Sequence, residues 1–318
     1  MRKIVVAGVA MLLASLVAAG PAAARYPVPY LFSAGGTAQA QTPDAPPPGA
    51  NDFSCRPSAA HPQPVVLVHG WIANQTDNWQ TISPILANNG YCVFSLTYGT
   101  DPNVSTPVYQ PGGLIPMEQS AQQLSDFVDE VLDATHASKV NIVGHSEGSL
   151  MPNWYVKYLG GAAKVKRYVG ITTLWHGTDV AGLASISQIG NALGVPPELY
   201  GAIDASCAAC REFLTGSDFI EQMRAGGIAA PGVTYTNIVT RNDELVSPYT
   251  SGIEYGPRIT NFVVQDQCPL DQAEHIAVAA DPVVAQDVLN ALDPSHPRPV
   301  PCTPVLPFEG APLYTGTQ

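Results

Sequence analysis

The stretch that decides the fold runs from residue 140 to residue 159 and reads VNIVGHSEGSLMPNWYVKYL. Its first four residues, 140–143, have the composition of a short strand, and residues 149–159 that of a helix. Between them, residues 144–148 match the pattern G-x-S-x-G, which is typical of a sharp turn from a strand into a helix. The pattern alone is weak evidence, but the strand before it and the helix after it supply the context that it requires.

The two glycines of this turn have a physical reason. A turn this sharp holds its central residue, Ser146, in a strained backbone conformation, and side chains at Gly144 and Gly148 would collide. The hydroxyl is left exposed above the sheet, and the N-terminus of the following helix favours negative charge that develops beside it. We therefore predict Ser146 as a nucleophile; the alternative is a glycine-rich turn whose serine has no chemical role.

Short apolar runs alternate with helical patterns on both sides of the turn. A continuous apolar run such as residues 65–68 is typical of a strand that is buried on both faces. Strands that alternate with helices predict an α/β fold, with a mostly parallel sheet of about six strands and helices on both faces. The predicted strands lie at 65–68, 92–97, 140–143, 168–172, 234–239 and 261–264, and the predicted helices at 78–89, 117–134, 149–159 and 281–292.

The segment from about residue 175 to residue 233 breaks this alternation. It is too long for a bare loop in a compact domain, so we interpret it as a helical cap inserted over the carboxyl edge of the sheet, where open α/β sheets bind ligands. Ile186, Ile189 and Leu193 have helical spacing and would form an apolar stripe. Two interpretations stay open: a lid that moves, and a cap that is packed permanently on the sheet.

A serine hydroxyl becomes a strong nucleophile only when a base removes its proton. After a turn of this kind, an acid and then a histidine follow the serine along the chain. Among the seven histidines, His275 and His296 come late enough. Since His296 stands in a Pro-rich segment beyond the last predicted helix, and His275 in the loop before that helix, we predict His275 as the base.

The acid that orients the base is expected at the end of the penultimate strand. Asp243 follows the predicted strand 234–239 within a few residues, and it is our first choice. Its neighbour Glu244 is the immediate alternative.

Acyl transfer also needs N–H donors for the negatively charged oxygen of its intermediate. One is the backbone N–H of the residue after the nucleophile, Glu147; the other is expected from the loop after an early strand, where the N–H of Trp71 follows His69 and Gly70. A fixed negative charge on Glu147 would oppose catalysis. We therefore expect its carboxylate to point away from the site and to be held by hydrogen bonds or by a nearby base.

The N-terminus has the features of an export signal. Arg2 and Lys3 precede an almost wholly apolar run at 4–17, and Ala22-Ala23-Ala24 fits the small-x-small cleavage rule. We predict a signal peptide at 1–24 and hence secretion; a weaker cleavage site ends at Ala40. The apolar run is short for a bilayer span.

Composition limits the class of protein and indicates how the chain divides into segments. The chain has 318 residues, of which 46% are hydrophobic and 13% charged, against about 25% charged in an average globular domain. The formal net charge of −12 argues against a phosphate-binding surface, and so against nucleic acid. We predict an extended, Pro/Gly-rich N-terminal arm at 25–60, one catalytic domain at 61–293 that includes the cap, and a Pro-rich tail at 294–318.

Six cysteines in an exported chain suggest disulfide bonds. Six cysteines allow 15 connectivities, and sequence order favours Cys55–Cys92, Cys207–Cys210 and Cys268–Cys302. The C-x-x-C spacing at 207–210 also fits a redox or metal motif. It has no second C-x-x-C and no nearby histidine, so a local structural disulfide is the preferred interpretation and no metal site is expected.

The segments at 64–71, 144–149, 175–178, 241–244 and 274–275, read together, resemble the secreted bacterial class 2 lipases of the α/β-hydrolase fold. The similarity runs from about residue 60 to residue 292, and the segment 175–178, WHGT, makes it more specific than the serine turn alone. It implies hydrolysis of triacylglycerols or shorter esters without a metal or an organic cofactor. Many members carry Gln at the position of Glu147.

The sequence therefore leads to a secreted carboxylic ester hydrolase, with a triacylglycerol lipase as the first hypothesis. The alternatives are a short-chain esterase, an acyltransferase that uses the same three residues, and a non-catalytic binding protein on a hydrolase scaffold. The expected partner is an ester or lipid, in solution or at a lipid–water interface. No nucleic acid is expected, and no integral membrane segment after the signal is cleaved.

Overall fold

The computed structural model of the chain describes residues 25–180, 190–191 and 193–316. The predicted signal peptide at 1–24 lies outside these residues, as do Ile186 and Ile189 of the predicted apolar stripe. Within the described part of the chain, no helix is both long and apolar enough to cross a bilayer.

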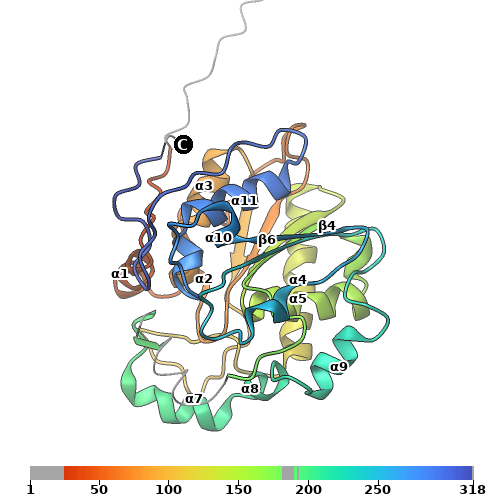
Figure 1. The fold of residues 1–318 in the computed structure, drawn as a ribbon. Coiled ribbons are helices and arrows are strands. Elements are labelled where there is room, and N and C mark those ends of the chain that lie inside the picture. Colours follow the sequence, from red (N-terminus) through yellow and green to blue (C-terminus); the bar gives the residue numbers. More distant parts are fainter. Residues whose placement is uncertain (1–24, 181–189, 192, 317–318) are drawn as a thin grey trace, which may run out of the picture.

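One parallel sheet with helices against it forms the centre of the molecule (Figure 1). Its strands are β1 (Val65–Val68), β2 (Val93–Leu96), β3 (Val140–His145), β4 (Val165–Ile171), β5 (Thr234–Val239) and β6 (Ile259–Val263). The main helices are α3 (Ile82–Asn88), α4 (Met117–Thr135), α5 (Glu147–Tyr158) and α11 (Pro282–Leu292).

The strand order is β2-β1-β3-β4-β5-β6, and all neighbouring strands are parallel. The prediction of a six-stranded parallel α/β sheet is therefore confirmed. From β1 the chain adds β2 on one side and β3 on the other. Such a point, where the strand order switches, leaves a crevice at the carboxyl ends of the strands in which open sheets bind ligands.

Both faces of the sheet are covered by helices. Val66 on β1 belongs to an apolar cluster with residues of α4 and α5, whereas its neighbour Val65 belongs to a second cluster with residues of α3 and α11. Because successive side chains of a strand point to opposite faces, the two clusters are the two sides of the sheet. This double burial explains why the run at 65–68 is apolar throughout.

The predicted helix at 78–89 is wrong in detail, because the chain forms a short helix, α2 (Gln75–Asn78), and then α3. Asn74 starts α2: its side chain accepts hydrogen bonds from the N–H groups of Thr76 and Asp77, as a helix-capping residue does. Gly90 follows the end of α3 with a φ of +84°, in the left-handed region that glycine adopts after many helices.

The N-terminal arm is not extended throughout, because α1 (Ser33–Gln41) forms within it. This helix has no apolar stripe in its sequence and is positioned by close packing on α2. A Cβ atom added at Gly35 would lie 2.1 Å from the carbonyl oxygen of Asp77. The contact depends on a residue distant in sequence, which is why local composition did not predict a helix.

The Pro-rich C-terminal segment lies beside the N-terminal arm (Figure 1). Leu31 and Gly310 form an antiparallel bridge, and the N–H of Phe32 donates to the carbonyl of Glu309 at 2.8 Å. The two ends of the described chain are therefore joined to each other by backbone hydrogen bonds.

The inserted segment after β4 is helical where the structure describes it. It contains η2 (Pro197–Leu199), α7 (Tyr200–Ser206), α8 (Ala209–Glu212) and α9 (Asp218–Arg224), which follow one another along one end of the molecule (Figure 1).

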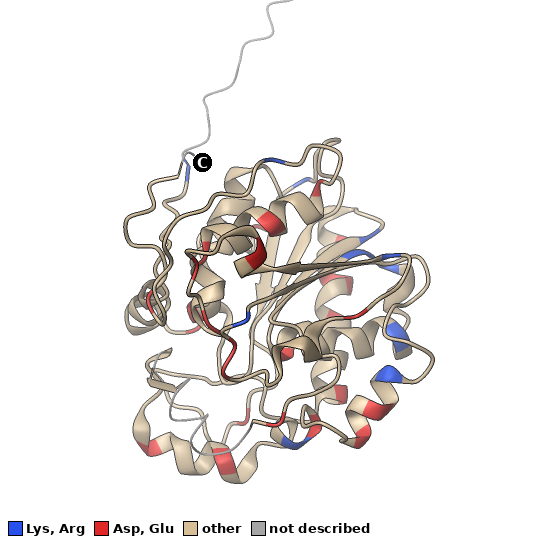
Figure 2. Ribbon diagram, viewed as in Figure 1, with Lys and Arg blue, Asp and Glu red and all other residues tan. Residues whose placement is uncertain are grey.

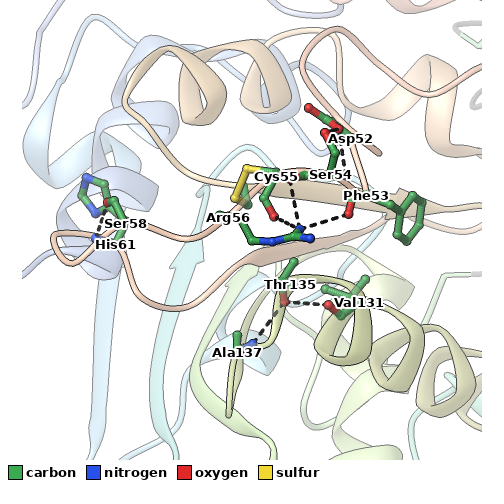
Figure 3. The surroundings of a disulfide bond; sticks show 11 residues. Asp52, Phe53, Ser54, Cys55, Arg56, Ser58, His61, Val131, Thr135 and Ala137 are labelled. Carbon is green, nitrogen blue, oxygen red and sulfur yellow. Dashed lines mark hydrogen bonds between the residues drawn. A yellow bond between two sulfur atoms is a disulfide. The ribbon is translucent and has the colours of Figure 1, made fainter.

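Three disulfides join the cysteine pairs favoured by sequence order: Cys55–Cys92, Cys207–Cys210 and Cys268–Cys302. Figure 3 shows the surroundings of Cys55, where the guanidinium of Arg56 donates to the backbone carbonyls of Phe53, Ser54 and Cys55. Charged residues are otherwise sparse, and Asp and Glu are spread over several helices and loops (Figure 2).

Candidate active site

Ser146 stands at the sharp turn between β3 and α5. Its φ of 56° and ψ of −125° are a strained conformation for a residue with a side chain. Both flanking glycines are required by contact: a Cβ atom at Gly144 would lie 1.7 Å from the carbonyl oxygen of Gly148, and one at Gly148 would lie 2.1 Å from that of Val68. The turn thus has the geometry that the sequence pattern predicts.

His275 and Asp243 lie in line with the serine. The distance from His275 Nε2 to Ser146 Oγ is 2.7 Å, and His275 Nδ1 lies 2.8 Å and 3.0 Å from the two carboxylate oxygens of Asp243. Asp243 follows β5, and His275 lies between β6 and α11. Three residues separated by up to 129 positions in sequence therefore meet at the carboxyl edge of the sheet.

Hydrogen bonds hold the Asp243 carboxylate in place. Its Oδ1 atom accepts the N–H groups of Leu245 at 3.0 Å and Val246 at 2.7 Å. Its own neighbour Glu244, the alternative acid, instead accepts the backbone N–H of His275 at 3.2 Å. The geometry therefore places Asp243, and not Glu244, on the imidazole ring.

The pKa of His275 is raised above its ordinary value by the balance of two effects. Burial on its own lowers the pKa of the imidazole, because it disfavours the charged form, and the carboxylate of Asp243 raises it by charge and by hydrogen bonding. The pair is almost fully enclosed, with side chains 4% and 2% exposed. Asp243 therefore lies where it would stabilise a protonated His275 ring. The rejected candidate, His296, is 81% exposed and pairs with Asp293 on the surface.

The loop after β1 presents the second expected N–H donor. Neither the N–H of Trp71 nor that of Glu147 donates a hydrogen bond to any acceptor among the described residues. Both belong to segments that border Ser146: an added Cβ at Gly70 would lie 3.2 Å from the Cβ of Ser146. These two N–H groups remain available for an oxygen atom of a substrate.

His69 fixes the peptide plane that carries the Trp71 N–H, a role that sequence reasoning missed. The N–H of Tyr98 donates to His69 Nε2 at 3.2 Å, so the ring proton is on Nδ1, which lies 2.8 Å from the carbonyl oxygen of Gly70. Burial lowers the pKa of His69 to about 4 and keeps the ring neutral. Because the carbonyl of Gly70 and the N–H of Trp71 belong to one peptide group, this bond orients the donor.

The side chain of Glu147 is buried away from solvent and lies against Tyr98. Its Oε1 atom is 3.2 Å from the Tyr98 hydroxyl, which is itself 2.9 Å from the carbonyl oxygen of His69. Burial raises the pKa of the Glu147 carboxyl well above its ordinary value. The expected hydrogen bond is thus present, while no basic side chain among the described residues pairs with Glu147.

Two apolar cavities meet at Ser146 and His275. One is lined by residues that include Trp71, Leu174, Val180 and Phe213. The other is lined by residues that include Ala73, Leu193 and Ile276. Such a pair of cavities suits a substrate with an apolar group on each side of the reacting atom.

The cap contributes directly to the first cavity. The rings of Trp71 and Phe213 pack at 5.4 Å, and the indole N–H of Trp71 lies 3.2 Å from Cys207 Sγ. The Cys207–Cys210 disulfide therefore packs beside the donor loop. Within the described ranges, no three His, Cys, Asp or Glu side chains gather as a metal site requires.

Known proteins are similar to the chain in sequence. The sequence model of the class 2 lipases matches residues 62–288. Triacylglycerol lipases from Pseudarthrobacter phenanthrenivorans and Burkholderia plantarii are each 27% identical to the chain over 202 residues, which is 57% of this chain and 60% and 54% of those proteins. The chain thus spans little more than half the length of these relatives.

A solved structure shares the fold. The structure of Aspergillus fumigatus lipase B matches with a TM-score of 0.59 at 19% identity, over 80% of this chain and 57% of that one. At this identity the likeness supports the α/β-hydrolase fold alone.

Proposed function

The chain belongs to the class 2 lipase family, and from this membership and the geometry of its site we propose that it is a serine hydrolase of carboxylic esters, with triacylglycerols as its substrate class. The observation that carries the proposal is the line of hydrogen bonds from Ser146 Oγ through His275 to Asp243, at 2.7 Å and 2.8 Å. This arrangement activates a serine hydroxyl without a cofactor.

The proposed reaction proceeds through an acyl-enzyme. Ser146 Oγ attacks the ester carbonyl while His275 Nε2 takes its proton, and Asp243 stabilises the imidazolium. The oxygen of the tetrahedral intermediate accepts hydrogen bonds from the N–H groups of Trp71 and Glu147. His275 then gives its proton to the leaving alcohol, and a water molecule, activated by the same imidazole, releases the acid and restores Ser146.

The choice of substrate class rests on two supports. The relatives reported above are triacylglycerol lipases, and apolar cavities flank the serine on both sides. The acyl chain would lie in the cavity walled by Trp71 and Phe213, and the alcohol part in the cavity walled by Ala73 and Ile276. Action at a lipid–water interface belongs to the same proposal.

We place the mature protein outside the cytoplasm. The basic residues Arg2 and Lys3, the apolar run at 4–17 and the Ala-rich site before residue 25 support an export signal. The three disulfides fit an oxidising compartment. The proposed catalytic domain is residues 61–293, with the cap as part of it.

The test is the Ser146→Ala variant assayed with p-nitrophenyl esters of increasing acyl length and with emulsified triolein. We expect kcat to fall by about 10⁴-fold or more, with an unchanged circular dichroism spectrum. The exposed Ser58 provides a matched control, and Ser58→Ala should keep wild-type turnover. Turnover by Ser146→Ala close to that of the wild type would refute the site, and hydrolysis limited to short esters would refute the triacylglycerol assignment.

A further inference from the structure

The segment that carries His275 is bracketed by two buried carboxyl groups. Asp271 lies four residues before the histidine and Asp281 six residues after it, and both are 0% exposed. Between them the chain forms the short helix η4 (Ala277–Ala280), and after Asp281 it enters α11. The ends of this catalytic loop are therefore marked by the same type of acid.

Each carboxyl uses one oxygen to bind the backbone. Asp271 Oδ1 accepts the N–H of Ala273 at 2.8 Å, and Asp281 Oδ1 accepts the N–H of Val283 at 2.6 Å. The Oδ2 atoms receive no N–H or O–H donor from the rest of the described chain. Instead the two carboxyl groups are hydrogen-bonded to each other. Since an ionised carboxylate has no proton to donate, one of the two must be protonated.

We propose that Asp271 and Asp281 share one proton across this contact and so clamp the two ends of the His275 loop together, as positioning residues for the catalytic base. The role in catalysis rests on the proposed function, whereas the shared proton does not. Among the described residues, the ring of His275 is hydrogen-bonded to Asp243 and Ser146, and to neither Asp271 nor Asp281. Their influence passes through the backbone of residues 272–280, which sets where the imidazole stands.

The surroundings of the pair favour a single proton. Burial is the largest cause that raises the pKa of both carboxyl groups, and the charge of Asp271 adds to the rise at Asp281. The pair as a whole therefore keeps one proton. The other charge that acts on Asp271 is the carboxylate of Glu274, which is itself held by the N–H groups of Ile276, Ala277 and Phe308.

Within the part of the chain that the structure describes, no cation acts on the pair. On α11, Asp287 bonds the side chain of Gln267; on α10 (Val264–Gln267), Asp266 pairs at the surface with Arg241. A second ionisation would therefore leave two like charges in contact inside the protein, where they repel strongly. The loop ends would separate, and His275 Nε2 would move from its position 2.7 Å from Ser146 Oγ.

Asparagine substitutions test the shared proton directly. In Asp281→Asn or Asp271→Asn, the new amide keeps one oxygen for the backbone N–H and donates permanently to the remaining carboxylate. In the double variant both oxygens are needed by the backbone, so two NH₂ groups would face each other and the contact would be lost. Each single variant should keep kcat within about twofold of wild type at pH 6, and the double variant should lose about 100-fold, as a catalytic group displaced by about 1 Å does.

The pH profile separates a shared proton from a merely structural contact. Wild-type kcat should fall at alkaline pH as the pair loses its proton, and in Asp281→Asn this fall should disappear. Asp287→Asn is the matched control: it removes another buried acid of α11, and its effect should add to that of Asp271→Asn. Additive effects of the two pair substitutions, or coincident pH profiles of wild type and Asp281→Asn, would overturn the proposal, even if the double variant does not fold.

Thermal stability can be measured without an enzymatic assay, so it tests the shared proton separately from the proposed function. Thermal unfolding from pH 5 to pH 9 should show Asp281→Asn gaining stability relative to wild type as pH rises, because the wild type binds the shared proton only when folded. If no ester is hydrolysed but this gain is seen, the function fails and the shared proton stands. A rise in the wild-type midpoint with CaCl₂ that both single variants lack would show a cation site and overturn the shared proton.

Discussion

Glu147→Gln tests whether a neutral acid lies beside the catalytic serine. A tyrosine hydroxyl has one proton, and that of Tyr98 lies nearer to the carbonyl of His69, at 2.9 Å, than to Glu147, at 3.2 Å. One proton cannot serve both acceptors fully, so a protonated Glu147 would supply the second proton of this contact. The raised pKa of its buried carboxyl agrees with this assignment. A glutamine amide can make the same donation at every pH.

The magnitude follows from proton linkage. A carboxyl whose pKa is raised in the folded state stabilises the fold most below its unfolded pKa of about 4.3, and stability is lost as pH rises toward the folded pKa. The loss is about 1.4 kcal/mol per pH unit for one such group. Above about pH 5, the unfolding free energy of Glu147→Gln should therefore increase relative to that of the wild type by about 1.4 kcal/mol per pH unit. Other buried acids, such as Asp77, are present in both proteins and cancel.

The measurement is urea unfolding of both proteins at pH 5, 6, 7 and 8, followed by tryptophan fluorescence. Glu130→Gln, an exposed position on α4, is the control; its carboxyl stays in water whether the chain is folded or not, so its curve should follow the wild type. If the curves for wild type and Glu147→Gln run parallel across this range, Glu147 is ionised in the folded protein and the proton assignment is wrong.

Two further predictions concern stability and the pH dependence of the reaction. Replacing Cys55 and Cys92 together by Ser should lower the unfolding free energy by about 4 kcal/mol, since the bond closes a loop of 37 residues. The same change at Cys207 and Cys210, which are 3 residues apart, should lower it by about 2 kcal/mol. Urea unfolding measures both losses, and equal losses would contradict the argument from loop length. The kcat/KM for ester hydrolysis should fall as pH drops through the raised pKa of His275, because the base must be neutral. In Asp243→Asn that limb should move to lower pH and kcat should fall by about 10⁴-fold; an unmoved limb would contradict the role of Asp243.

Features that depend on neighbouring residues were predictable from sequence. The turn around Ser146 is dictated by two glycines whose absent side chains make room within five residues, and the buried strands are marked by continuous apolar runs. Asp243 and His275 could be predicted to lie near Ser146 because the order of strands places both at one edge of the sheet.

Features that depend on distant contacts were not predictable. The helix α1 requires Gly35 to approach the backbone of Asp77, and no local pattern shows that neighbour. His69 was recognised only as the residue before Gly70, although its tautomer is fixed by Tyr98, 29 positions away. The contact between Asp271 and Asp281 depends on the loop folding back on itself, and two single acids in a sequence carry no sign of it.

The state of each acid near the serine is decided by its donors and not by its residue type. Asp243 accepts hydrogen bonds from two backbone N–H groups and lies 2.8 Å from the imidazole Nδ1, so three donors surround its carboxyl group. Glu147 is equally buried, but the one hydroxyl beside it is shared with the carbonyl of His69, and its Oε2 atom has no partner among the described residues. Burial with so few donors raises its pKa and favours the neutral form, so an acid can occupy the position next to Ser146 without opposing the negative charge that would develop on a substrate oxygen.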